Sequence, residues 1–77
     1  MDNLIKEKSI QVIVTKQVHE HLKACLEVIY NYRKYVMYNP YMTSIIDEHI
    51  GLTELRIILA RAIIRKNQED IESIVSS

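Results

Sequence analysis

The chain has 77 residues, with 10 basic and 10 acidic side chains and no net charge at pH 7. This balance argues against a phosphate-dominated function, because nucleic-acid-binding domains usually carry a clear basic excess. Hydrophobic residues make up 48% of the chain, with one glycine and one proline, which excludes a disordered chain and favours a helix-rich one. A domain of this size buries little surface by itself, so we expect residues 1–77 to form one small domain completed by oligomerisation.

The cysteine content and the length of the apolar runs bear on localisation. Cys25 is the only cysteine, which excludes an internal disulfide and fits a reducing cytoplasm. The first residues lack the basic start and apolar run of a secretory signal. Apolar runs are far shorter than the roughly 20 residues of a membrane-spanning helix. We therefore expect a cytoplasmic protein without a membrane segment.

The first patterned segment is residues 9–15 (SIQVIVT), where β-branched side chains recur with period two. This alternation predicts a short strand. Extending the following helix backwards would place Lys8, Gln11 and Thr15 in its apolar stripe, so the strand is favoured over a longer helix. A lone strand has no mate in this chain, so the prediction implies a second molecule.

From Lys16 onward the apolar period becomes helical, and we predict a long amphipathic helix over residues 16–38 with Thr15 as its N-cap. Its apolar arc is about 200° wide, whereas one packing partner needs roughly 100°. The dipeptide Asn39-Pro40 ends the helix, because a residue before proline is disfavoured in the helical region. The members of the arc are Val18, Leu22, Ala24, Cys25, Leu26, Val28, Ile29, Tyr35 and Val36.

A short helix is predicted next, over residues 44–50. Thr43 or Ser44 supplies its N-cap. Gly51 fits the left-handed position that closes such a helix.

A third helix is predicted over residues 53–67, with cations and Asn67 near its end. Its continuation to residue 75 is left open, as is the order of residues 1–8 and 68–77. The expected architecture is thus mainly α: a strand-like start, then a helical hairpin or bundle completed by oligomerisation.

The third helix carries apolar residues on two sides, which is typical of a helix buried between two neighbours. One side faces residues 18–36 in this interpretation, and the other has nothing left in the chain to cover it. The first set is Leu55, Ile58, Leu59, Ala62 and Ile63, and the second is Ile57, Ala60 and Ile64. We predict that Ile57, Ala60 and Ile64 form a partner interface.

Five tyrosines surround the proline: Tyr30, Tyr32, Tyr35, Tyr38 and Tyr41. Tyrosine mixed with basic residues stacks on unpaired bases in some proteins. It also suits protein interfaces, where the ring is covered and the hydroxyl stays wet. Because the charge is balanced, the interface role is favoured, with Tyr35, Tyr38 and Tyr41 as rim anchors.

Metal binding and catalysis are not favoured. His21 and Cys25 are four residues apart, a spacing that presents two ligands on a helix, and His49 with Asp47 could add more, but no further cysteine or CxxC-type cluster follows. Cys25 lies within the apolar arc, where a thiol behaves as a small apolar side chain rather than a nucleophile. We expect no enzyme activity, no cofactor and no metal.

The layout of residues 9–30, a short alternating strand followed by a capped helix, resembles that of the ribbon-helix-helix repressors. The resemblance implies that the strand pairs with its twin from a second subunit and enters the DNA major groove. It places Gln11, Ile13 and Thr15 on the DNA-facing side. This sequence departs from the pattern at Ile13, and no Arg or Lys stands there to read guanine.

The sequence as a whole favours a small non-enzymatic helical protein that acts by protein–protein interaction. An adaptor, an inhibitor or a regulatory or co-chaperone protein would fit, as a homodimer or as one subunit of a heteromer. The alternative is a dimeric DNA-binding repressor of ribbon-helix-helix-like layout. The expected partner is a second copy or another protein, and nucleic acid is not favoured.

Overall fold

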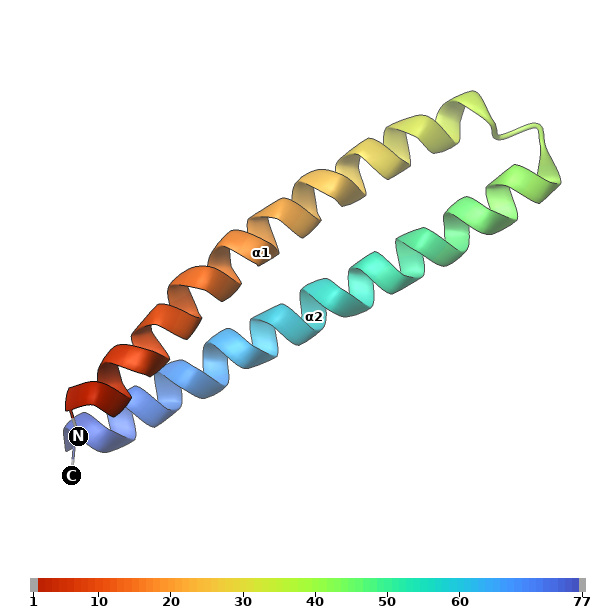
Figure 1. The fold of residues 1–77 in the computed structure, drawn as a ribbon. Helices are drawn as coiled ribbons and strands as arrows, with labels where there is room; N and C mark the ends of the chain where they lie inside the picture. The colour runs from red at the N-terminus through yellow and green to blue at the C-terminus, as the bar shows by residue number, and fades with distance from the viewer. Residues whose placement is uncertain (1, 77) are drawn as a thin grey trace.

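The computed structural model describes residues 2–76, and these form a hairpin of two long antiparallel helices (Figure 1). Helix α1 spans Asp2–Tyr35 and has 34 residues, and helix α2 spans Pro40–Ser76 and has 37. Residues 36–39 make the turn between them. The mainly helical class and the helical hairpin are therefore confirmed, and the described residues contain no strand.

The predicted strand at residues 9–15 is wrong, because this segment lies within α1. A helix bonds its own backbone groups, whereas a lone strand would leave its N–H and C=O groups without partners. Two of the three polar residues that argued against a helix lie against α2, and the third, Gln11, is exposed. The Lys8 ammonium lies 2.9 Å from an Asp70 carboxylate oxygen, and Thr15 is half-buried. Val12, only 8% exposed, anchors the segment.

The second and third predicted helices are one continuous helix. Gly51 does not close a helix, since no described glycine has a positive φ angle and α2 runs through it. The N-cap is Asn39 rather than Thr43 or Ser44. The Asn39 Oδ1 accepts hydrogen bonds from the backbone N–H groups of Tyr41 and Met42, at 3.1 and 3.2 Å.

The proline explains why the turn lies where the sequence predicted it. Pro40 is the first residue of α2, where its missing N–H costs no hydrogen bond and its fixed φ suits a helix start. The preceding residue is pushed out of the helical region, so α1 ends before it. Helix α1 ends at Tyr35, three residues before the predicted end at residue 38.

The two helices meet along one line of contact, here called the seam. In a two-helix hairpin a side chain is covered chiefly by the opposite helix, so the less exposed residues mark the seam. Most of them recur in alternating steps of three and four residues, the heptad spacing of coiled coils. In α1 and the turn the seam residues are Ile5, Lys8, Val12, Thr15, His19, Leu22, Leu26, Ile29, Arg33 and Val36. In α2 they are Ile46, Ile50, Thr53, Ile57, Ala60, Ile64, Asn67, Ile71 and Ile74.

The hairpin is long and thin, with Cα extents of 58 × 14 × 13 Å and a radius of gyration of 17.4 Å. A compact 77-residue domain has a radius of gyration of about 11.5 Å. No described side chain is less than 2% exposed. Two helices without a third layer thus cover one face of each other and leave the remaining faces open.

Candidate interaction surface

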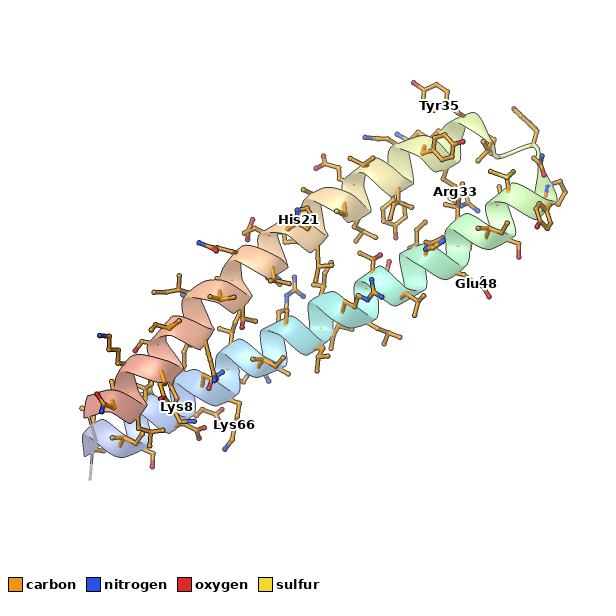
Figure 2. The ribbon with its side chains drawn as sticks, in the orientation of Figure 1. Lys8, His21, Arg33, Tyr35, Glu48 and Lys66 are labelled. Carbon is orange, nitrogen blue, oxygen red and sulfur yellow. The ribbon has the colours of Figure 1, made fainter. Side chains whose placement is uncertain are left out.

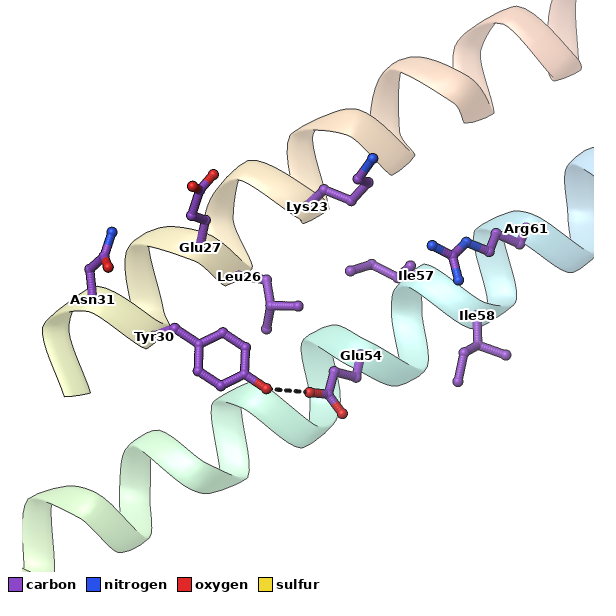
Figure 3. A pocket seen from close by; sticks show the side chains of 9 residues that line it. All are labelled: Lys23, Leu26, Glu27, Tyr30, Asn31, Glu54, Ile57, Ile58 and Arg61. Carbon is purple, nitrogen blue, oxygen red and sulfur yellow. Dashed lines mark hydrogen bonds between the residues drawn. The ribbon is translucent and has the colours of Figure 1, made fainter. Parts of the chain in front are cut away.

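Polar contacts across the seam fix the register of the helices. Besides the Lys8–Asp70 pair, the Arg33 Nε lies 2.7 Å from Asp47 Oδ1. The Tyr30 hydroxyl donates to Glu54 Oε1 at 2.7 Å, in the half of the hairpin nearer the turn (Figure 3). Further toward the termini, the Arg61 Nε donates to His19 Nε2 at 3.0 Å. Four contacts spread along the length hold the chain in a single alignment.

These contacts shift the pKa of four of the groups involved, among them Arg33, whose pKa is raised by its hydrogen bond to Asp47. The hydrogen bond from Arg33 lowers the pKa of Asp47 below its ordinary value of 3.8. Hydrogen bonds from Lys8 and Lys66 lower the pKa of Asp70 in the same way. The pKa of Tyr30 is raised above 10.0, first because its hydroxyl donates to Glu54.

Two polar side chains are buried in the seam of α2, and both bond to their own helix. The Thr53 hydroxyl donates to the His49 carbonyl at 2.7 Å. The Asn67 side-chain amide donates to the Ile63 carbonyl at 3.0 Å. No buried side-chain nitrogen or oxygen among residues 2–76 lacks a hydrogen-bond partner. The seam is therefore satisfied, and a site for binding must be sought outside it.

The hairpin has two broad sides, and one of them is apolar. Grooves between side chains show which residues share it: Val18 and Leu22 of α1 line one groove with Arg56, Leu59 and Ile63 of α2. The exposed apolar side chains on this side repeat with near-heptad spacing on both helices. We call this set the apolar face: Val14, Val18, Val28 and Tyr32 from α1, and Leu52, Leu59 and Ile63 from α2.

The exposed fractions show how open the apolar face is. Val28 is 67% exposed, Leu59 is 60% exposed and Tyr32 is 51% exposed. Cys25 lies among them, in a shallow groove with His21 and Val28. Leu55, 63% exposed, borders the face on α2. The face runs from the turn to about Val14, leaving the end with the two termini more polar.

The opposite side of the hairpin is charged. Figure 3 shows Lys23, Glu27 and Arg61 around the Tyr30–Glu54 hydrogen bond. Its exposed ionic residues are Lys16, Glu20, Lys23, Glu27 and Lys34 from α1, and Asp47, Glu54, Arg61 and Arg65 from α2. Ile58, 59% exposed, is an apolar residue that lines the groove on this charged side. The hairpin is therefore amphipathic across its width, with one apolar side and one charged side.

The three residues predicted as a partner interface lie in the seam instead. Ile57 is 6% exposed and Ala60 is 5% exposed, both covered by α1, and Ile64 is half-buried. The assignment of the two faces was inverted: Leu59 and Ile63, which we expected to pack inside the chain, are exposed. The signal that distinguishes the faces is continuity. The seam row runs the whole length of α2, whereas the row through Leu59 becomes charged beyond Ile63.

The tyrosines predicted as rim anchors lie at the turn. Tyr35 is 84% exposed, Tyr38 is 91% exposed and Tyr41 is 74% exposed. Figure 2 shows Tyr35 at the turn end of α1, far from Lys8 and Lys66 at the other end. Tyr32, which was not named as a contact residue, belongs to the apolar face. The three named tyrosines thus surround the turn end of that face.

The residues that the repressor resemblance placed on DNA do not share a surface. In a helix, residues two apart point about 200° apart. Gln11 and Ile13 are exposed, while Thr15 is half-buried against α2. Because the strand is absent from the described residues, the resemblance to the ribbon-helix-helix layout loses its structural basis.

The two candidate metal ligands, His21 and Cys25, lie side by side on α1. The His21 Nε2 lies 3.6 Å from Cys25 Sγ, but no group of three or more potential ligands gathers anywhere in this part of the chain. Neither α1 nor α2, over the residues described, is both long and apolar enough to cross a bilayer.

No protein-family model, no curated protein and no solved structure matches the chain.

Proposed function

We propose that the protein is a non-enzymatic helical module that acts by binding protein, and that the apolar face is its working surface. The observation that carries the proposal is the concentration of exposed aliphatic and aromatic side chains from both helices on one side of the hairpin, opposite a charged side. Exposed apolar patches with a polar rim mark interaction sites in soluble proteins. An adaptor, an inhibitor or a regulatory subunit would use such a surface.

The energetics support binding rather than chemistry on this face. Its side chains are about half exposed, so covering each one stabilises by roughly 1 kcal/mol. Seven such side chains therefore offer several kcal/mol to whatever covers them. The tyrosines at the turn extend the surface with rings that bury well and hydroxyls that stay hydrated.

The proposal is tested by placing a photo-crosslinking amino acid, benzoylphenylalanine, at Leu59 or at Ile58. These neighbours in α2 are equally exposed, 60% and 59%, but lie on opposite sides of the hairpin. In the cells that make the protein, the label at position 59 is expected to form protein adducts, with itself or with another protein. The label at position 58 is the matched control. Absence of adducts at position 59, or equal adducts at both positions, would overturn the proposal.

A further inference from the structure

We infer that the occupant of the apolar face is a second copy of this chain, so that two hairpins pack face to face as a four-helix bundle. The inference rests on the proposed function, because it names the partner of the same surface. It excludes a foreign protein as the primary occupant. Four observations carry it: exposed area, the thin interior, the spacing of the face, and its charge.

The exposed area matches what a homodimer needs. The chain exposes 6044 Å², whereas a compact monomer of 9.1 kDa exposes about 4,900 Å². The excess is about 1,100 Å², which exceeds the ~800 Å² that each partner contributes to an interface of standard size. Two copies burying that excess would form an interface of about 2,200 Å², which falls in the range of permanent homodimers.

The thin interior requires a partner that is always present. Among the side chains that the structure describes, five apolar ones are buried: Val12, Ile46, Ile50, Ile57 and Ala60. A domain normally consists of at least two packed layers around one core, and this hairpin is a single layer of two helices. A protein that folds only with its partner needs that partner in equal amount. A second copy of the same chain is always present in equal amount, whatever the rate of synthesis.

The spacing of the face favours a second hairpin over a globular surface. On α1, Val14, Val18, Val28 and Tyr32 keep the same heptad period as the seam, as do Leu52 and Leu59 on α2. From Val14 to Tyr32 the face extends for roughly 27 Å along a nearly straight helix. Side chains spaced at 3.5 residues interdigitate along such a length only with helices of the same period. An identical pair of helices provides that period on both sides.

The charges allow two copies to approach each other. Arg56 is the one ionic side chain among the residues that line the groove with Val18, Leu59 and Ile63. The chain as a whole carries 10 basic and 10 acidic residues. One exposed cation on each copy repels the other only weakly, because water and salt screen exposed charges. Face-to-face pairing also leaves both charged sides in water, on the outside of the bundle.

The test is the absolute mass by light scattering, over a hundredfold range of concentration, for the unaltered chain and for two variants. The unaltered chain is expected at twice its 9.1 kDa. Leu59→Glu introduces a carboxylate into the interface twice per dimer, and should weaken self-association at least about a hundredfold. Ile58→Glu, made at an equally exposed neighbour on the charged side, should remain a dimer.

Leu59→Glu can lose its fold together with its partner, so the mass of the unaltered chain is decisive by itself. A mass of one chain at every concentration overturns the inference, as does a dimer that Ile58→Glu disrupts and Leu59→Glu does not. If the chain is a monomer and the crosslinker at position 59 still captures other proteins, the self-pairing is wrong and the proposed function stands. If neither pairing nor adducts occur, both are wrong.

Discussion

Replacing Gly51 with alanine tests whether α2 is continuous. Gly51 lies inside α2 and has no positive φ angle. A Cβ atom added there meets no heavy atom within 4 Å, so alanine fits without strain. In a helix interior alanine is more favourable than glycine by about 1 kcal/mol. For a domain of this size that corresponds to a rise in Tm of roughly 4–8 °C.

The assay is thermal unfolding followed by circular dichroism, at one fixed concentration because the Tm of an associating chain depends on concentration. Ala62→Gly, at an exposed position of the same helix, is the matched control and should lower the Tm by a similar amount. If α2 were instead two helices separated by a left-handed Gly51, the alanine would be strained and would destabilise the protein. A fall in Tm for Gly51→Ala would therefore refute the continuous helix.

Three further predictions concern the seam. The Asn67 side chain is 7% exposed and donates to a carbonyl of its own helix. Asn67→Leu should therefore raise the free energy of unfolding, measured by urea titration, by about 1 kcal/mol. A loss of stability would contradict this. The pKa values of Asp47 and Asp70 are lower in the folded chain than in the unfolded one, so their stabilisation is present above about pH 4 and is lost as the pH falls below it. Urea midpoints measured from pH 7 to pH 2 should drop in that range, and Lys8→Met should make the drop smaller. The pKa of Tyr30 is raised on folding, so its contribution to stability is present below pH 10 and is lost as the pH rises through the folded pKa. Tyr30→Phe should remove this loss of stability at alkaline pH. An unchanged dependence of stability on pH would show that the bond to Glu54 does not contribute.

The helical class and the position of the turn were predictable because their signals are local. A proline at the first position of a helix, with asparagine before it, ends one helix and caps the next whatever the rest of the chain does. The wide apolar arc of α1 likewise indicated more than one packing surface. That arc comprises the seam and the apolar face, which share α1.

The strand and the choice of face were not predictable from short windows. Residues 9–15 are β-branched, and their place in a helix depends on contacts with the far end of α2, including the Lys8–Asp70 pair. Gly51 looked like a helix end, and dividing α2 there hid the row that runs from Ile46 to Ile74. Without that row, the two apolar sides of residues 53–67 looked equivalent, and the wrong one was assigned to the partner.

The central claim, that the apolar face pairs with the same face of a second copy, is tested most directly by isotope-filtered nuclear Overhauser spectroscopy. A sample mixing ¹³C-labelled and unlabelled chains reports only contacts between different copies. The methyl groups of Val18, Val28 and Leu59 are predicted to show contacts with unlabelled chains, while the methyl groups of Ile58 show none. Contacts at Ile58 without contacts at Leu59, or no contact between copies at all, would contradict the account.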